Sequence, residues 1–163
     1  MSLLSNVLVG IDQLAKRLYV KSGGEIDIEV GGAVKYGSVA RNVVYTVQGQ
    51  ATTAEIKVGK TILADLTGAT VTVVDVYMQA IGGNAGGATS VDIKDTAEVA
   101  LVAFPVAQLT QNTVNCMGDA AVTSVHAVTA TAGKGLIIQD TAKNSLTTCT
   151  HVNYVVKYTI AAS

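Results

Sequence analysis

Three aspartates in strand-like segments are the best candidates for acid–base or metal chemistry. Asp92 and Asp95 lie three residues apart, and Asp75 lies in the preceding apolar segment. Converging carboxylates act as acid and nucleophile in glycosidases, and clusters of them bind calcium. Neither an aromatic platform nor a ligand-dense loop accompanies these aspartates, and aspartates at turns or on solvent-facing surfaces are more common. We therefore expect no enzyme. A sugar-processing activity that depends on Asp92 or Asp95 is the weakest of three functional hypotheses.

The two cysteines and two histidines are spread along the chain. Cys149 and His151 share one face of an expected strand, whereas Cys116 and His126 are distant from them in sequence. Zinc sites draw on closely spaced ligand pairs, and a nucleophilic cysteine needs a base and a group that orients it. We therefore expect no metal and no cofactor. Cys116 and Cys149 can form a disulfide if their Cα atoms lie within about 7 Å, but two buried free thiols are favoured.

Two glycine-containing segments resemble nucleotide-binding loops only superficially. Val58-Gly59-Lys60-Thr61 has the end of a P-loop, but Ala54 stands where that motif needs glycine, and a strand-like segment follows in place of a helix. The run Gly82–Gly87 separates two β-rich segments, Thr70–Met78 and Ser90–Ile93. Because glycine readily adopts positive φ angles, we expect this run to close a hairpin between them.

The composition limits the classes of partner. Hydrophobic residues make up 49% of the 163 residues and charged residues only 14%, so we expect other chains to cover part of the surface, as in a homo-oligomer. The net charge of -1 provides no field that would attract nucleic acid. No apolar run reaches the roughly 18 residues that cross a membrane. Asp12 interrupts the first apolar stretch, so we expect synthesis in a cytoplasm without a secretory signal.

The N-terminal region combines a helical period with an alternating one. Spacings of three and four residues predict a short amphipathic helix that ends at Ser22-Gly23-Gly24, with an apolar stripe of Leu4, Val7, Ile11, Leu14 and Leu18. Strict alternation then predicts an extended β arm whose apolar face carries Ile26, Ile28 and Val30. Ala33–Tyr36 is expected to return as a second short strand. The helix packs either on its own body or on a partner or further copies of the chain.

The remainder of the chain predicts a mainly β fold, a jelly-roll or β-sandwich body over residues 39–163 that follows an attachment region over residues 1–38. The last strand should be long and central, and a shift of the apolar phase within Thr70–Met78 predicts a β-bulge. Asp-Thr-Ala occurs at Asp95 and again at Asp140, which local turn chemistry explains. The expected strands are Asn42–Gln48, Ala54–Val58, Thr61–Asp65, Thr70–Met78, Ser90–Ile93, Val99–Phe104, Val114–Met117, Ser124–Thr129, Gly135–Gln139 and His151–Ile160.

Several of these segments together resemble a known family. Within Thr61–Ile160, the strand and turn VVDVYMQAIGG, the strand exit SVDIKDT, the turn QLTQN and the strands KGLIIQ and NYVVKYTI are similar to small auxiliary virion proteins of tailed bacteriophages. The short glycine-punctuated arm at Gly24–Ser38 is similar as well. The resemblance implies a capsid cement or decoration protein on the outer surface of the head. It would be oligomeric, with a trimer favoured, and an N-terminal arm would bind the major capsid protein.

The resemblance carries over no active-site residues. It assigns capsid attachment to the N-terminal apolar positions, namely Leu4, Val7, Ile11, Leu14, Leu18, Ile26, Ile28 and Val30. The alternative is a tail-appendage or receptor-binding module of a phage. In that case the loops near Gly82–Gly87 and Asn112–Thr123 would be the ligand surface.

Overall fold

The computed structural model describes residues 9–12, 17–20, 33–36, 39–119, 122 and 126–162. Strands account for 54% and helix for 5% of the chain, so the predicted mainly β class is confirmed. Every ladder between named strands is antiparallel.

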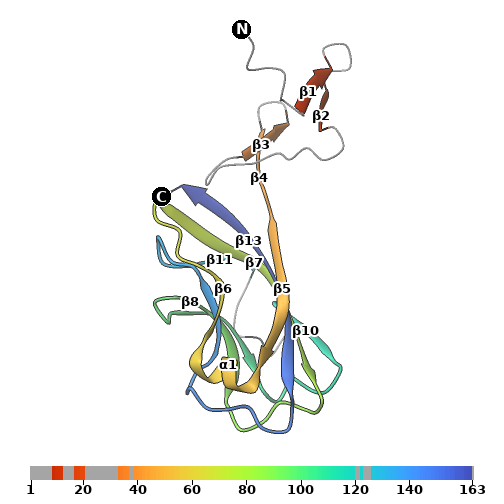
Figure 1. The fold of residues 1–163 in the computed structure, drawn as a ribbon, viewed down its shortest axis with the longest axis vertical. Coiled ribbons are helices and arrows are strands. Elements are labelled where there is room, and N and C mark those ends of the chain that lie inside the picture. The colour runs from red at the N-terminus through yellow and green to blue at the C-terminus, as the bar shows by residue number, and fades with distance from the viewer. Residues whose placement is uncertain are drawn as a thin grey trace.

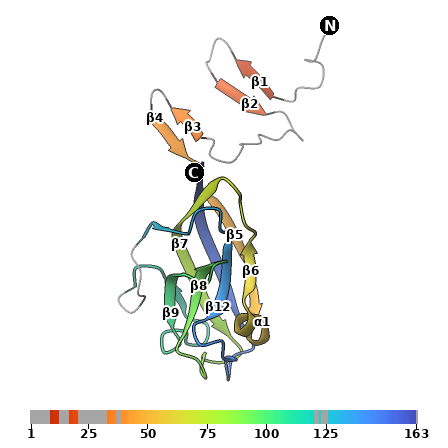
Figure 2. The same ribbon diagram turned by 90° about the vertical axis from the view of Figure 1, so that its left-hand side faces the viewer.

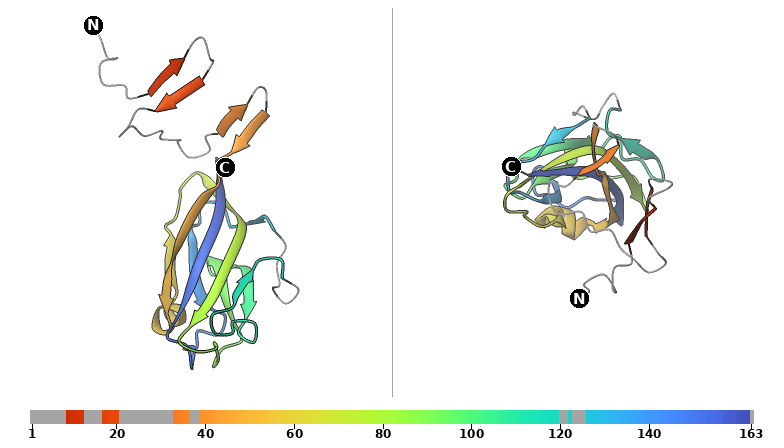
Figure 3. Two further views of the ribbon diagram at one scale, coloured as in Figure 1. Left: turned by 90° about the vertical axis from the view of Figure 1, so that its right-hand side faces the viewer. Right: turned by 90° about the horizontal axis from the view of Figure 1, so that it is seen from above.

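Residues 45–162 form two sheets. In the first, the strand order is β10 (Val114–Cys116), β7 (Ala69–Ile81), β13 (His151–Ala162) and β5 (Tyr45–Thr52), and β11 (Val128–Thr129) also pairs with β7. In the second, the order is β6 (Lys60–Leu63), β12 (Leu136–Asp140), β8 (Ser90–Asp95) and β9 (Ala100–Pro105). The two sheets lie face to face (Figures 2 and 3).

The core lies between the sheets because each strand alternates its side chains. From the first sheet it includes Met78 and Val156, and from the second Ile93, Phe104 and Ile138, all of which are almost fully buried. As predicted, the last strand is long and central: β13 spans 12 residues and pairs with β7 on one side and β5 on the other.

The predicted bulge is also confirmed. Lys157 of β13 pairs with Asp75 of β7, but the next residue, Tyr158, pairs with Val73, so Val74 is the extra residue. The buried positions of β7 accordingly change phase from Val73 to Val76. The bulge keeps both halves of this 13-residue strand facing the core.

The predicted hairpin across Gly82–Gly87 is wrong. The strand before this run, β7, belongs to the first sheet, and the strand after it, β8, belongs to the second. The glycines instead allow close approach to the segment before β13, because a Cβ on Gly83 would overlap the carbonyl oxygen of Thr148.

The strand predicted at Ala54–Val58 is instead a helix, α1 (Thr53–Val58). Thr52 caps it: the Thr52 Oγ1 accepts a hydrogen bond from the Glu55 N–H at 3.2 Å, and the Glu55 carboxylate accepts one from the Thr52 N–H at 2.8 Å. This reciprocal pair is a capping box. Ile56 from the middle of α1 is fully buried in the core.

The N-terminal region contains strands where the structure describes it. β1 (Val9–Asp12) pairs with β2 (Arg17–Val20), and β3 (Ala33–Tyr36) pairs with β4 (Val39–Asn42). The helix predicted over residues 4–18 is therefore not confirmed. β-Branched Val9 and Ile11 flank Gly10, and these residue types disfavour a helix interior. The strand predicted at Ala33–Tyr36 is present.

Of the remaining predicted strands, most overlap an observed one, and the described part of Ser124–Thr129 contains the short β11. The β3–β4 hairpin crosses the boundary predicted between residues 38 and 39. Residues 1–42 are called the leading segment below. β1 to β4 lie beyond the end of the two sheets at which β5 begins (Figure 1).

Candidate functional site

The predicted attachment residues lie mostly outside the described residues, including Leu4, Val7, Leu14, Ile26, Ile28 and Val30. Ile11 and Leu18 are described, and they are directly opposite each other in the β1–β2 ladder. The structure thus brings these two positions together as a cross-strand pair, not as neighbours on a helix.

The two loops predicted as an alternative ligand surface are joined where the structure describes them. The Gln111 N–H donates to Asn84 Oδ1 at 2.8 Å, and the Asn112 N–H donates to the Ala80 carbonyl at 3.0 Å. The segment before β13 completes this surface, because the Thr147 N–H donates to the Gly86 carbonyl at 2.8 Å. The three loops form one continuous end of the molecule, called the loop end below.

The loop end lies opposite the leading segment. In the central ladders His151 is level with Thr52 and Ile81, next to the loops, whereas Tyr158 is level with Tyr45, where β5 begins. A ligand at the loop end and a partner on the leading segment would therefore contact opposite ends of the two sheets.

The three candidate catalytic aspartates do not converge. Asp75 belongs to the first sheet, and Asp92 and Asp95 belong to the second. Asp95 is fully buried and accepts hydrogen bonds from the N–H groups of Ala97, Val99 and Thr131 at 2.9–3.0 Å. Burial raises the pKa of Asp95, but the hydrogen bonds from Thr131, Val99 and Ala97 outweigh it and leave that pKa below its usual value. Asp95 therefore shapes a turn.

Asp92 belongs to a buried polar row on the outward side of β8. Asp92 and Lys94 are only 1% and 5% exposed although they point away from the core. Asp92 accepts a hydrogen bond from the Thr141 hydroxyl, and Lys94 Nζ donates to Gln139 Oε1 at 3.2 Å. Polar side chains at such low exposure need partners of this kind, and Asp92 Oδ1 has none among the described residues.

A surface ion pair crosses above this row. Glu98 follows β8 and Lys143 follows β12. Because these two strands are antiparallel, the two residues come from opposite ends of the strand pair. Even so, Lys143 Nζ lies 2.8 Å from Glu98 Oε1. Both side chains of this pair are about half exposed. Asp92 itself, at 1% exposure, presents almost no surface to a substrate.

The cysteines and histidines do not form a reactive site. Both cysteines are free thiols. Cys116 Sγ lies 3.2 Å from the Asp119 carboxylate, and this hydrogen bond raises the pKa of the Cys116 thiol, while burial raises that of Cys149. Neither shift favours the nucleophilic thiolate. Among the residues that the structure describes, no group of three or more His, Cys, Asp or Glu side chains could hold a metal ion.

A surface that the sequence did not reveal lies on the outward side of the first sheet. The ladders align Gln50 of β5, Asn153 of β13 and Gln79 of β7 in one row across three strands. These three carboxamides are called the amide row. The adjacent row consists of Gln48, Val155 and Tyr77. In the sequence these residues appear only as polar positions that alternate with apolar ones along each strand. That alternation does not show which residues of different strands become neighbours.

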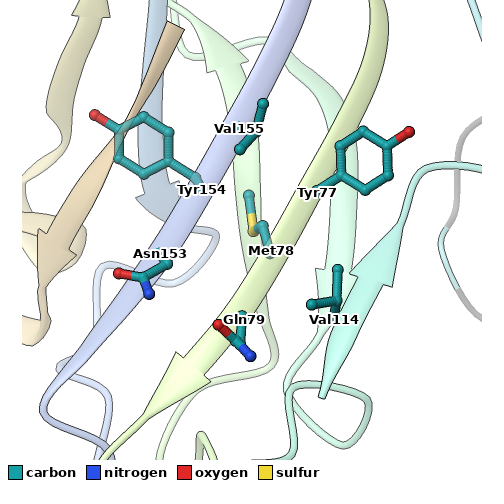
Figure 4. A pocket seen from close by; sticks show the side chains of 7 residues that line it. All are labelled: Tyr77, Met78, Gln79, Val114, Asn153, Tyr154 and Val155. Atoms are coloured by element: carbon teal, nitrogen blue, oxygen red, sulfur yellow. The ribbon is translucent and has the colours of Figure 1, made fainter. Parts of the chain in front are cut away.

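Two shallow hollows lie along the amide row. One, of about 110 Å³, is bordered by Tyr77, Gln79, Val114 and Asn153 (Figure 4). The other, of about 420 Å³, is bordered by Gln48, Gln50 and Asn153. Because Asn153 borders both, the hollows are adjacent on either side of β13.

Charges occur at one end of this face. Asp75 accepts a hydrogen bond from Tyr77 and so raises the pKa of the Tyr77 hydroxyl. Lys157 Nζ lies 3.8 Å from the Asp75 carboxylate and 5.0 Å from the centre of the Tyr77 ring. Asp75 and Lys157 thus form an ion pair, and the cation–π contact between Lys157 and Tyr77 helps to hold the Tyr77 ring in place.

Within the described part of the chain, no helix has the length and apolar character needed to cross a membrane. No family model matches the chain, and neither the curated proteins nor the solved structures include one that is significantly similar to it.

Proposed function

We propose that residues 45–162 form a jelly-roll β-sandwich. Apart from β11, the body has eight strands, and within the two sheets they pair from the outside of the chain inward. The first strand, β5, pairs with the last, β13; β6 pairs with β12, β7 with β10, and β8 with β9. These are the partners produced when one long antiparallel hairpin is rolled into two sheets, which is the arrangement of a jelly roll. Jelly rolls are common in viral capsid proteins.

The function that this arrangement supports best is that of a structural virion protein without enzymatic activity. It would bind the lattice of the major capsid protein on the outside of a phage head and stabilise it. The observation that carries the proposal is that the described strands of the leading segment pair only with each other, β1 with β2 and β3 with β4, and with neither sheet.

Isolated two-stranded hairpins are marginally stable in water. The leading segment would therefore gain most from a partner surface, while the body has its own core. Binding that occurs only on the assembled lattice stabilises the lattice by mass action, and the copies of a homotrimer would add avidity. The family resemblance supports the trimer and the major capsid protein as partner.

Truncation tests this proposal. The full chain and residues 43–163 would each be sedimented with capsids assembled from the major capsid protein of the same phage. We expect the full chain to cosediment and the truncated chain, still folded by circular dichroism, to lose at least about tenfold in affinity. Ile11→Asp should weaken binding similarly, and Asp12→Asn serves as its neighbouring control. Unchanged binding by residues 43–163 would reject the attachment role.

A tail-appendage or receptor-binding module is the second candidate, and the joined loops of the loop end favour it. In this case antibodies against the chain would label the tail in electron micrographs of virions, and the purified chain would bind host cells. Labelling of the head together with capsid binding decides for the cement protein.

A further inference from the structure

The amide row and its two hollows have a chemistry distinct from the rest of the surface. Among the described residues that line the hollows, none is charged. The charges near them are paired: Lys60, whose Nζ donates to the Gln50 carbonyl at 2.6 Å, lies 3.0 Å from Glu55 Oε1, and Lys157 lies 3.8 Å from the Asp75 carboxylate. Because each of these charges already has an opposite partner, an ion would gain little here, and the matching ligand is neutral.

The hydrogen-bonding capacity of this face exceeds what the protein itself uses. Each carboxamide has two donor hydrogens and an acceptor oxygen. Gln79 Nε2 donates to the Asn112 carbonyl at 2.9 Å, while Asn153 Oδ1 is buried with no hydrogen-bond partner among the described residues. An unpaired buried acceptor is destabilising. A ligand hydroxyl that reached Asn153 would supply the missing donor.

Apolar surface lies directly beside the amides. Val114 is 59% exposed at the edge strand β10 next to Gln79, and Tyr77 and Val155 are level with each other on β7 and β13 (Figure 4). The ligand should therefore carry hydroxyl groups along its edges and C–H groups on its faces, as a sugar ring does. The larger hollow, of about 420 Å³, is open to solvent, so a ligand would lie along the sheet surface and not be enclosed.

We propose that this face of the first sheet binds a neutral oligosaccharide, with the amide row as hydrogen-bonding partners and the Tyr77 ring, over one face of which Lys157 Nζ lies, as an additional contact for a sugar ring. A second copy of the chain fits less well, since the centres of protein interfaces are enriched in aromatic and apolar groups. Here an interface would bury carboxamides from three strands against identical carboxamides. The proposal is independent of whether the chain occupies the head or the tail.

Nuclear magnetic resonance titration of the isotope-labelled full chain tests the proposal. The probes are maltohexaose, cellohexaose and chitohexaose, with hexagalacturonate as an acidic control. We expect at least one neutral probe to shift the backbone signals of Gln50, Gln79 and Asn153, and hexagalacturonate to shift none of them.

Variants separate this face from other surfaces. Tyr77→Ala and Asn153→Asp should each weaken binding about tenfold. Gln108→Glu, an amide-to-acid change at an exposed turn outside the face, should leave it unchanged. The proposal is overturned if no neutral probe shifts these signals at about 10 mM, or if shifts map to the loop end. It is equally overturned if the face instead mediates self-association that Asn153→Asp abolishes in analytical ultracentrifugation.

Discussion

Asp95 and Asp140 show how a repeated tripeptide serves the fold. In each, one carboxylate oxygen accepts the N–H groups two and four residues later, from Ala97 and Val99 at Asp95 and from Ala142 and Asn144 at Asp140. The interpretation of Asp-Thr-Ala as turn chemistry is therefore confirmed. The two sites differ in the second oxygen: that of Asp95 accepts the Thr131 N–H at 3.0 Å, while that of Asp140 has no described partner.

This difference predicts unequal effects of the same substitution. In Asp95→Asn an NH₂ group replaces one of the two carboxylate oxygens, so it faces either the Thr131 N–H or the N–H groups of the turn. Two donors then meet without an acceptor, and we expect a loss of about 1–3 kcal/mol in the free energy of unfolding. Asp140→Asn can keep its single bonded oxygen and should cost less than about 1 kcal/mol. Urea unfolding measures both. Equal losses would contradict the assignment of roles to the second oxygen.

Asp65 predicts a dependence of stability on acid pH. The Thr96 hydroxyl, the Gly135 N–H and Lys134 all donate to this carboxylate and lower the pKa of Asp65 to about 2. In the unfolded chain the carboxyl group titrates near its ordinary value of about 3.9. Between these values the unfolded state binds more protons, so stability falls as pH is lowered from about 4 to about 2.

The measurement is the midpoint of urea unfolding at a series of pH values. Asp65→Asn should lower stability at pH 7 and reduce the loss between about pH 4 and about pH 2. Glu55, with a pKa lowered to about 2 by the Thr52 N–H, Lys60 and the Thr52 hydroxyl, keeps part of the acid sensitivity in this variant. A variant with the same slope as the original chain would show that Asp65 is not protected in this way.

At the scale of elements, regular alternation predicted the strands well. The pattern of β13 and the phase shift of β7 could be read from sequence because each buries one face. Alternation misled at residues 54–58, where Ala54, Ile56 and Val58 alternate with Glu55 and Lys57. There the capping box decides in favour of α1. No local feature of the sequence indicates that β8 joins a different sheet from β7.

The cap of α1 can be tested without changing its buried face. Thr52→Ala removes the hydroxyl that accepts the Glu55 N–H at 3.2 Å, and we expect the free energy of unfolding to fall by about 1 kcal/mol. Thr52→Ser keeps the hydroxyl and should stay close to the original stability. If serine and alanine are equally destabilising, the methyl group of Thr52 and not its cap is responsible.

At the scale of the molecule, the sequence could not predict the amide row. Gln50, Gln79 and Asn153 are brought level by ladders between strands far apart in sequence, and a shift of one residue would turn each side chain to the other face. The attachment residues remain a prediction, because the structure describes only Ile11 and Leu18 of that set.

Because of the same long-range pairing, the C-terminal strand should contribute much more to the stability of the fold than the N-terminal strands do. β13 lies between β5 and β7 and contributes the buried Val152 and Val156, whereas the described strands of the leading segment join neither sheet. Residues 43–163 should therefore unfold cooperatively with the thermal midpoint of the full chain. Residues 1–150 lack β13 and should show no cooperative transition in circular dichroism, because both flanking strands lose their partner.

Refolding should be correspondingly slow. Since the first sheet closes only when the last strand arrives, we expect residues 43–163 to refold from urea in milliseconds to seconds, as other β proteins dominated by non-local pairing do. Stopped-flow measurements on residues 43–163 and on the full chain give the comparison. A cooperative transition in residues 1–150, or a large loss of stability in residues 43–163, would mean that the leading segment and not β13 completes the core.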